Sequence, residues 1–328
     1  MSRTVVVVNP WAAGGRVGRD LAGLRRAVEA RLGAVELVQT TEAGGGAARA
    51  REAALGGAAR VLSLGGDGTH HEVVNGLMEA GRPDVIFGVL PVGTGGDFRR
   101  TLGVGDLMGA LVAIAERPAR RVDLGHATFV DDGGAERTRW FLNLASCGMS
   151  GLVDRLVNTS SKALGGTASF LLGTLRATAR YEPARARVEV DGALLGELDV
   201  TVIAVGNGRY AGGGMHFCPH AALDDGALDV VVVPHARLPR QLARLPALYR
   251  GTLERVPGAL RARGAEVRVT CLRGTAWLDL DGEAPGRAPV TFRVEPKALT
   301  LAGAPLAGSA AQAARPGRPR RPEGRYAS

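Results

Sequence analysis

Residues 60–70 read RVLSLGGDGTH, in which a β-branched, apolar run is followed at once by three glycines around Asp67. The run at 60–64 predicts a buried strand, and the glycines permit a tight turn whose amide groups are open to a phosphate. A helix expected from about residue 71 to 80 adds its positive N-terminal end to this turn. Because open parallel sheets bind ligands at the carboxyl ends of their strands, we expect Asp67 to lie in a ligand site.

The same arrangement follows one strand later. Residues 85–90 predict a strand, and the next eight residues, PVGTGGDF at 91–98, form a second glycine-rich turn. This turn contains Gly93, a hydroxyl from Thr94 and a second carboxylate from Asp97. Either turn alone is as well explained as a simple connection, but the two together favour a single phosphate-binding crevice. The P-loop pattern GxxxxGK[ST] does not occur in the sequence, so a nucleotide kinase would have to use another fold.

Strand and helix patterns alternate through the first third of the chain. Strand patterns at 3–8 and 35–40 precede the two described above, and an amphipathic helix pattern around 21–32 lies between them. An alanine-rich helix follows the second strand, and a further helix is expected at 108–116. This alternation predicts a parallel sheet covered by helices, which we assign to an ATP-binding domain over residues 1–124.

The pattern changes beyond about residue 122. Short β-branched runs separated by turn residues follow at 140–145, 186–190, 200–205 and 228–233. They predict a second, mainly antiparallel β domain over residues 125–304. Helical interruptions are expected at 152–157, 168–179 and 239–262. The last segment, 305–328, is rich in proline and arginine and is expected to be a disordered basic tail.

These motifs resemble the diacylglycerol kinase catalytic-domain family, which includes bacterial soluble diacylglycerol kinases and related lipid kinases such as the ceramide and sphingosine kinases. Further elements of the likeness are NP at 9–10, EVVNGL at 72–77, DLG at 123–125, NLASCG at 143–148, GGGM at 212–215, DDGALD at 224–229 and DGE at 281–283. The ordered matches run from about residue 4 to residue 300. The resemblance implies a Rossmann-like parallel α/β domain of the NAD kinase and diacylglycerol kinase type, followed by a mainly antiparallel β-sandwich domain.

The resemblance also implies a site for ATP, accompanied by Mg²⁺, between the two domains. The implied nucleotide-contacting residues are Asn9, Thr40, Gly66, Asp67, Gly68, Thr69, Glu72, Gly93 and Thr94. Asp67, Asp97 and Asp123 are implied to hold the magnesium and its water network. Asp281 and Glu283 are tied to catalysis in the family, and either is a candidate for the base that removes the proton of the lipid hydroxyl. Without the upstream motifs, Asp281-Gly282 would be interpreted as a β-hairpin turn.

A separate, structural magnesium site is implied for the segment 222–229. By position, its ligands are the carboxylate of Asp225 and the backbone carbonyls of Ala222 and Ala227. Hard oxygen ligands of this kind suit Mg²⁺. The alternative is a simple Asp-Gly turn between two strands.

Two places depart from the family pattern. The usual asparagine at position 96 is Gly96, which removes an amide for nucleotide contact that Arg99 or Arg100 would have to replace. His70 and His71 stand where smaller or amide residues are common. Because adjacent helix residues do not share a face, a metal site is not expected there. Instead, we expect one histidine to face the nucleotide crevice and the other to face the solvent.

The net charge of +9 and the pI of about 10.4 favour an anionic partner. Nucleic acid is not expected, because 4% aromatic residues leave few platforms for base stacking. The segment 238–263 combines leucines with arginines and would suit an anionic membrane surface, although a helix packed on the β domain with a solvated arginine face explains it slightly better. We find neither a spanning segment nor a secretory signal, so a cytoplasmic, peripherally membrane-associated protein is expected. The family offers homodimers as precedent.

We therefore expect an ATP-dependent lipid kinase that phosphorylates a hydroxyl of a membrane lipid. Diacylglycerol, giving phosphatidic acid, is the default acceptor; a long-chain base, ceramide or another lipid alcohol stays open, because apolar pockets discriminate chain type weakly. One alternative is an NAD kinase, which shares the Gly-Gly-Asp-Gly turn but which the motifs at 93–98 and 281–283 disfavour. The other is a catalytically silent relative that binds lipid or nucleotide as a regulator, for which Gly96 is the one hint.

Overall fold

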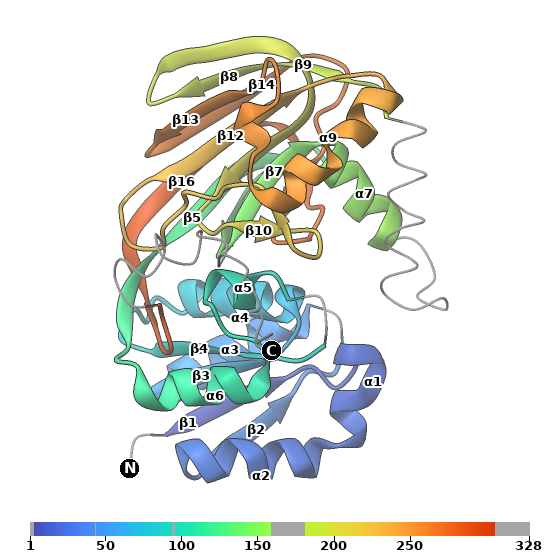
Figure 1. The fold of residues 1–328 in the computed structure, drawn as a ribbon. Coiled ribbons are helices and arrows are strands. Elements are labelled where there is room, and N and C mark those ends of the chain that lie inside the picture. The colour runs from blue at the N-terminus through green and yellow to red at the C-terminus, as the bar shows by residue number, and fades with distance from the viewer. Residues whose placement is uncertain (1–2, 43, 94–95, 159–180, 306–328) are drawn as a thin grey trace, which may run out of the picture.

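The β-branched runs of the N-terminal third form adjacent parallel strands (Figure 1). The computed structural model describes residues 3–42, 44–93, 96–158 and 181–305. Along the sheet the order is β2 (Glu36–Gln39), β1 (Thr4–Val8), β3 (Arg60–Gly65) and β4 (Ile86–Pro91). All three pairings are parallel. The central strands β1 and β3 are buried almost throughout, as expected for a parallel sheet with helices on both faces.

Helices cover both faces of this sheet and confirm the predicted α/β alternation. They are α1 (Ala12–Arg19), α2 (Leu21–Leu32), α3 (Gly45–Leu55), α4 (Asp67–Glu79), α5 (Phe98–Thr101) and α6 (Leu107–Glu116). Ala50 of α3 and Val73 of α4 belong to the apolar cluster on one face, and Val28 of α2 and Leu111 of α6 belong to the cluster on the other. Helix α4 begins four residues earlier than predicted, so part of the glycine-rich turn is its first turn.

The second half of the chain is mainly antiparallel, as predicted. Its strands are β5 (Arg120–Asp131), β6 (Glu136–Phe141), β7 (Leu144–Gly148), β8 (Ala184–Val190), β9 (Ala193–Gly206), β10 (Tyr210–Ala211), β11 (Met215–His216), β12 (Leu228–Pro234), β13 (Leu260–Gly264), β14 (Glu266–Arg273), β15 (Leu278–Leu280) and β16 (Gly286–Leu301). Six of these twelve strands follow the order β13-β12-β9-β8-β14-β16. Val188, Ile203 and Phe292 lie in the apolar core that these strands enclose.

Two long strands connect the halves. β5 and β16 pair over most of their length, and the end of β16 continues into the first sheet. There Thr300 and Leu301 pair in parallel with Ile86 and Phe87 of β4. The chain therefore returns to the N-terminal sheet with its last strand. The boundary expected at residue 124 falls inside β5, and the division into domains stays a prediction.

Two sequence expectations are wrong in detail. The run at 140–145 is divided between β6 and β7, because the amides between them bind a side chain of the second half instead of a neighbouring strand. The helix expected at 239–262 is shorter: α9 (Leu238–Arg250) ends at Gly251, whose φ of 67° lies in the left-handed region. The chain then forms a 3₁₀ turn, Leu253–Arg255, and β13, which pairs with β12.

The remaining helix expectations fall into two groups. Helix α7 (Met149–Asn158) confirms the expectation at 152–157. The helix expected at 168–179 and the basic tail at 306–328 lie outside the described residues. Within the described ranges, no helix is both long enough and apolar enough to cross a membrane.

Helices α3 and α4 approach each other closely at a glycine of α4. A side chain at Gly76 of α4 would overlap the backbone carbonyl of Ala47 in α3. We expect Gly76→Ala to lower the free energy of unfolding by about 2–3 kcal/mol, because the two helices would have to move apart in a packed core.

Urea unfolding followed by circular dichroism measures this change. Gly105→Ala is the matched control, because Gly105 is exposed and nothing lies within 4 Å of its added methyl group. A Gly76 variant as stable as the control would contradict the close approach of the two helices.

Candidate active site

The first glycine-rich turn lies at the carboxyl end of β3 and runs directly into α4. Gly66 precedes the helix in an extended conformation, and its carbonyl accepts a hydrogen bond from the His70 amide at 3.1 Å. The amides of the first helical turn therefore have no intrahelical acceptor and carry the positive end of the helix dipole. Asn9, just after β1, donates from Nδ2 to Oγ1 of buried Thr69 at 3.1 Å. A side chain at Gly65 would overlap Thr69, so glycine is required there.

Thr40 and Glu72 lie beside this turn with different surroundings. The buried Thr40 follows β2, and its amide donates to the carbonyl of Val8 at 2.9 Å. The carboxylate of Glu72 accepts from the amides of Gly44 and Gly46 at 3.1 and 2.9 Å, at the N-terminus of α3. Thr40 thus lies at the same edge of the sheet as the turn. The carboxylate of Glu72 joins α4 to the start of α3.

The two glycine-rich turns are joined by a carboxylate. Asp67 accepts from the backbone amides of Asp97 at 2.8 Å and Phe98 at 3.2 Å, one on each carboxylate oxygen. Gly93, with φ of 96°, brings the second turn close to the loop after β1, where its added methyl group would lie 3.7 Å from the Cβ of Ala13. The two glycine-rich turns therefore lie side by side, as the single-crevice hypothesis requires. Thr94 lies outside the described residues.

Asp97 continues the connection into the β-rich half. Its carboxylate accepts from the amides of Gly213 and Gly214, both at 2.7 Å, and from the Arg100 guanidinium at 2.9 Å. The GGGM motif at 212–215 therefore has a physical role that the sequence did not reveal: its amides bind this carboxylate. Three donors occupy Asp97, so it acts here as a connector between the halves.

The electrostatics of these carboxylates favour a cation nearby. Burial raises the pKa of Asp67 to about 6; the amides of Asp97 and Phe98 oppose this effect, and the Asp97 carboxylate adds to it. Burial also raises the pKa of Asp97, against the Gly213 amide and the charge of Arg100. Burial is thus the main cause of both raised pKa values, and a magnesium ion that arrives with a nucleotide would favour the charged form of Asp67.

Asp281 organises the break between β6 and β7. Its carboxylate accepts from the amides of Leu142 at 2.7 Å and of Asn143 and Leu144, both at 2.9 Å. The Nδ1 atom of His71 lies 3.3 Å from the same carboxylate. Asp281 and the next residue both have positive φ, 53° and 92°, as in the tight hairpin turn that the Asp-Gly pair also suggested.

Glu283 lies over the N-terminus of α4. Its Oε1 atom is 3.2 Å from the position that a Cβ on Gly68 would occupy. The hairpin is fixed by Asp279, which accepts from the Gly282 amide and from the Ser146 hydroxyl, both at 2.7 Å. The tertiary fold thus brings the DGE motif to the first glycine-rich turn, about 200 residues away in the sequence.

Both histidines of α4 are buried, so the expectation that one of them faces the solvent is wrong. His70 points inward to the hydroxyl of Ser63, and burial lowers its pKa to about 3. His71 faces Asp281 and Asn75, where Nε2 lies 3.4 Å from the Asn75 amide. The reason is that α4 is covered both by α3 and by β6, which sequence periodicity could not show.

Asp123 binds a different part of the chain from Asp67. Asp123 is buried, and its carboxylate accepts from the amides of Gly226 and Lys297 at 2.7 and 2.8 Å. It thereby holds the 222–229 turn. In that turn Asp225 forms an ion pair with Arg263 and accepts from the Ala227 amide at 3.2 Å.

The turn fits the implied structural magnesium poorly. Both carboxylate oxygens of Asp225 are engaged by protein donors, and a guanidinium supplies the positive charge. Ala222 and Ala227, whose carbonyls were the other implied ligands, lie in the same turn. The described residues also contain no group of three histidine, cysteine or acidic side chains placed to bind a metal ion.

Two asparagines were not predicted as site residues. Asn143 accepts from the hydroxyl of Thr101 at 2.9 Å, and so joins α5 to the β-rich half. Asn207 is fully buried and donates to the carbonyls of Asp123 and Leu142 at 3.0 and 2.8 Å. Asn143 opens a motif quoted above, whereas Asn207 had no signal beyond a polar residue following a buried strand.

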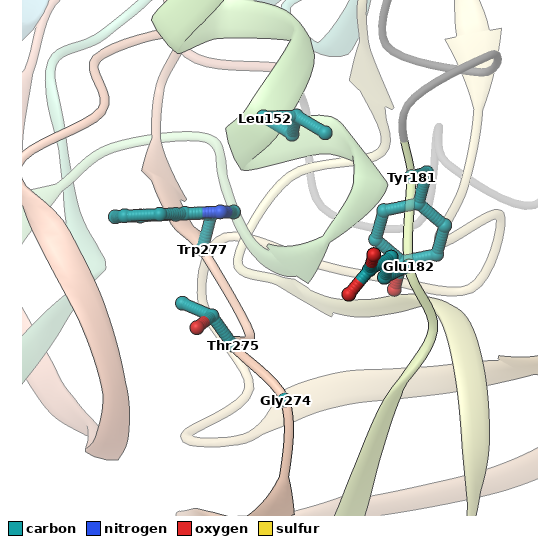
Figure 2. A pocket seen from close by; sticks show the side chains of 6 residues that line it. All are labelled: Leu152, Tyr181, Glu182, Gly274, Thr275 and Trp277. Atoms are coloured by element: carbon teal, nitrogen blue, oxygen red, sulfur yellow. The ribbon is translucent and has the colours of Figure 1, made fainter.

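A cavity of about 230 Å³ lies beside α7 (Figure 2). It is lined by Leu152, Tyr181, Glu182, Gly274, Thr275 and Trp277. Trp277 immediately precedes β15, the strand that leads to the DGE motif. Helix α7 packs tightly there, because a side chain at Gly151 would lie 2.5 Å from the Trp277 carbonyl oxygen. The cavity and the motif thus lie at the two ends of the short strand β15.

Comparison with known proteins covers both halves of the chain. The family model "Diacylglycerol kinase catalytic domain" matches residues 3–127, and "YegS C-terminal NAD kinase beta sandwich-like domain" matches residues 143–303. A Pseudomonas fluorescens protein named "Probable lipid kinase YegS-like" is 34% identical over 295 residues, which are 88% of this chain and 93% of that protein. A Chromohalobacter salexigens protein of the same name is 38% identical over 211 residues, 63% of this chain and 64% of that protein.

Comparison with solved structures gives a similar result. A crystal structure of a protein from Bacillus anthracis strain Sterne, assigned as a diacylglycerol kinase, superposes with a TM-score of 0.73 at 25% identity. The superposition covers 92% of this chain and 95% of that one. Motifs, architecture and relatives agree over both halves: the chain belongs to the diacylglycerol kinase catalytic-domain family and is a lipid kinase.

Proposed function

We propose that this lipid kinase transfers the γ-phosphoryl group of ATP to a hydroxyl of diacylglycerol, forming phosphatidic acid, with Glu283 as the general base. The position of Glu283 is the observation that carries the proposal. Its carboxylate lies against Gly68 in the first turn of α4, where a helix N-terminus receives phosphates. A hydroxyl that approaches the terminal phosphate would pass beside this carboxylate.

Asp281 is less suited to the role of the base. Its two oxygens already accept three backbone amides, and His71 lies 3.3 Å away. Protonating it would weaken the bonds that hold Leu142 and its neighbours in place. We therefore assign Asp281 as the positioning residue that fixes Glu283.

ATP would bind with its phosphates at the amides of the two glycine-rich turns. Magnesium accompanies the nucleotide and neutralises charge on the phosphates. Among the three carboxylates implied to hold the magnesium and its water network, Asp67 is the one in the first turn of α4, where the phosphates would bind, although backbone amides contact all three.

The chemical step follows from this arrangement. Glu283 accepts the proton of the lipid hydroxyl while the oxygen attacks the γ-phosphorus, and the bond from that phosphorus to the bridging oxygen of ADP breaks. ADP leaves with the electron pair of that bond. Phosphoryl transfer depends mainly on positioning and charge neutralisation, and a general base adds about 10²- to 10⁴-fold in rate.

The cavity beside α7 suits an acyl chain of the acceptor. Trp277 and Asp281 are four residues apart on the β15 segment, a separation of about 13 Å for extended chain. A lipid with its hydroxyl at Glu283 could therefore place part of a chain against Trp277 and Leu152. A cavity of about 230 Å³ holds part of a chain and leaves the rest for the membrane or a neighbouring surface.

Transfer of labelled γ-phosphate from magnesium ATP to diacylglycerol, sphingosine, ceramide and NAD tests the function. We expect label on diacylglycerol, and a 10²- to 10⁴-fold lower kcat in Glu283→Gln at unchanged thermal stability. Asp281→Asn should lower activity and also the free energy of unfolding, by about 1–3 kcal/mol, because its amide cannot accept all the hydrogen bonds.

Each other outcome has a definite meaning. Label on sphingosine or ceramide would replace the acceptor and keep the lipid kinase, whereas label on NAD alone would overturn the lipid acceptor. ATP binding without transfer to any acceptor would favour a silent regulator. A Glu283→Gln variant with full kcat would exclude Glu283 as the base.

The raised pKa of Asp67 predicts a pH dependence of stability. Between about pH 4 and pH 6 the folded protein keeps a proton on Asp67 that the unfolded chain has lost, so the free energy of unfolding falls as the pH rises through this window. The fall attributable to Asp67 is about 2–3 kcal/mol. In Asp67→Asn this part of the slope should disappear. Urea titrations from pH 4 to pH 8 measure it, and equal slopes in both proteins would contradict the assignment.

Arg99 is predicted to compensate for Gly96. A Cβ on Gly96 would lie 3.2 Å from Cδ of Arg99, so the arginine side chain covers the place where the family's asparagine would stand. We expect Arg99→Gln to raise the KM for ATP about tenfold with a smaller change in kcat, because a charge-assisted contact to a phosphate is lost.

The double variant Gly96→Asn with Arg99→Ala should recover part of the ATP affinity. Arg137→Gln is the control, since Arg137 is exposed on β6 and pairs with Asp131. Steady-state kinetics with ATP varied at saturating acceptor measure both effects. An unchanged KM in Arg99→Gln would show that Gly96 is not compensated by this side chain.

A further inference from the structure

Helix α9 lies on the outside of the β-rich half (Figure 1) and carries exposed apolar side chains. Leu242, Leu245 and Tyr249 are 54%, 45% and 58% exposed. Their spacing of three and four residues places them on one side of the helix. Three large apolar side chains in one row, open to solvent, form a contiguous patch of the kind that marks an interaction surface.

The orientation of α9 is fixed by two of its polar side chains, Gln241 and Arg244, which bind backbone carbonyls of the β-rich half. Gln241 donates from Nε2 to the carbonyl of Ala236, and Arg244 donates from Nη1 to the carbonyl of Pro234, both at 2.7 Å. On the same inner side Leu248 packs against an apolar cluster of the β-rich half. A helix that only faces water has the reverse arrangement, with polar residues outward. The sequence and the tertiary contacts together therefore keep the leucines on the surface.

The charged residues from 237 to 250 are all arginines. Arg237, Arg240 and Arg250 are exposed beside the apolar patch, and no acidic residue occurs from 237 to 250. Many arginines elsewhere on the described surface pair with an acid, as Arg3, Arg25 and Arg187 do, but the salt bridges of the described residues include none of these three. Apolar side chains flanked by unneutralised arginines are the composition of helices that lie in the interface of an anionic bilayer.

We propose that α9 is a membrane-docking surface, with Leu242, Leu245 and Tyr249 inserted among lipid headgroups of an anionic bilayer and the arginines on the phosphates. Membrane binding needs only this surface; its use in delivering the acceptor rests on the function proposed above. The helix is connected to the cavity: the rings of Tyr181, which lines the cavity, and His235, three residues before α9, have centroids 6.3 Å apart. A docked α9 would hold the cavity close to the bilayer surface.

Vesicle sedimentation of the full chain tests the proposal. We expect binding to vesicles of phosphatidylcholine and phosphatidylglycerol, and at least a tenfold weaker partition for Leu242→Ser/Leu245→Ser/Tyr249→Ser, because each side chain loses burial among acyl chains. Arg240→Gln/Arg250→Gln should bind the anionic vesicles about tenfold less tightly, with little change on pure phosphatidylcholine. Leu194→Ser, at a 61% exposed leucine of β9, is the control and should bind like the wild type.

A second measurement does not depend on loss of binding. Tyr249→Trp places an indole in the patch, and vesicles with brominated acyl chains should quench it more strongly than the native tryptophans. Leu194→Trp should gain no such quenching. Phosphoryl transfer then separates this proposal from the kinase function: the apolar triple variant should keep its rate on water-dispersed short-chain diacylglycerol and lose at least tenfold on diacylglycerol in anionic vesicles.

Other results would contradict the proposal that α9 docks on a membrane or would limit what it implies. Equal vesicle partition of the triple variant and the wild type would show that the patch does not dock, whatever the basic tail contributes. A wild type that sediments as a dimer without lipid, and a triple variant that sediments as a monomer, would make the face an interface between two copies. Vesicle binding through α9 without phosphoryl transfer to any lipid would leave the docking surface standing and would remove the kinase function alone.

Discussion

The carboxylate of Asp281 is the contact on which the geometry of the site depends. By accepting the amides of Leu142, Asn143 and Leu144, it ends one strand, begins the next and fixes the turn that carries Glu283. Without it, three buried amides would need other acceptors, at a cost of about 1–3 kcal/mol for each unsatisfied group. The same bonds place Glu283 over the first turn of α4, so one side chain sets both the strand break and the position of the proposed base.

Carboxylate-to-amide bonds also join the two glycine-rich turns to each other and to the β-rich half. Asp67 binds the amides of the second glycine-rich turn, Asp97 binds those of Gly213 and Gly214, and Asp123 binds those of Gly226 and Lys297. Partial burial of such groups is tolerated because hydrogen bonds replace the lost water. Burial raises the pKa values of Asp67 and Asp97, and the positive charge of a magnesium nucleotide would favour their ionised forms.

Much of the fold and part of the site could be predicted from local sequence. The β-branched runs, the glycines after β3 and β4 and the change to short strands follow from steric preferences of the residues themselves. Residue spacing could not predict that Asp281 would bind amides at 142–144 or that both histidines of α4 would be buried. Each of these depends on which distant segment covers the residue, and a linear pattern contains no information about that.

The sequence by itself determined the parallel α/β half, the antiparallel half and the two turns suited to phosphates, because periodicity and glycine steric freedom act over a few residues. Only the tertiary structure decided which of the implied carboxylates remain suited to chemistry. Packing committed Glu72, Asp97, Asp123 and Asp281 to backbone amides, and it brought Glu283 to Gly68 from the far end of the chain. It also turned the leucines of α9 outward, because hydrogen bonds from Gln241 and Arg244 to strand-end carbonyls fix the rotation of the helix.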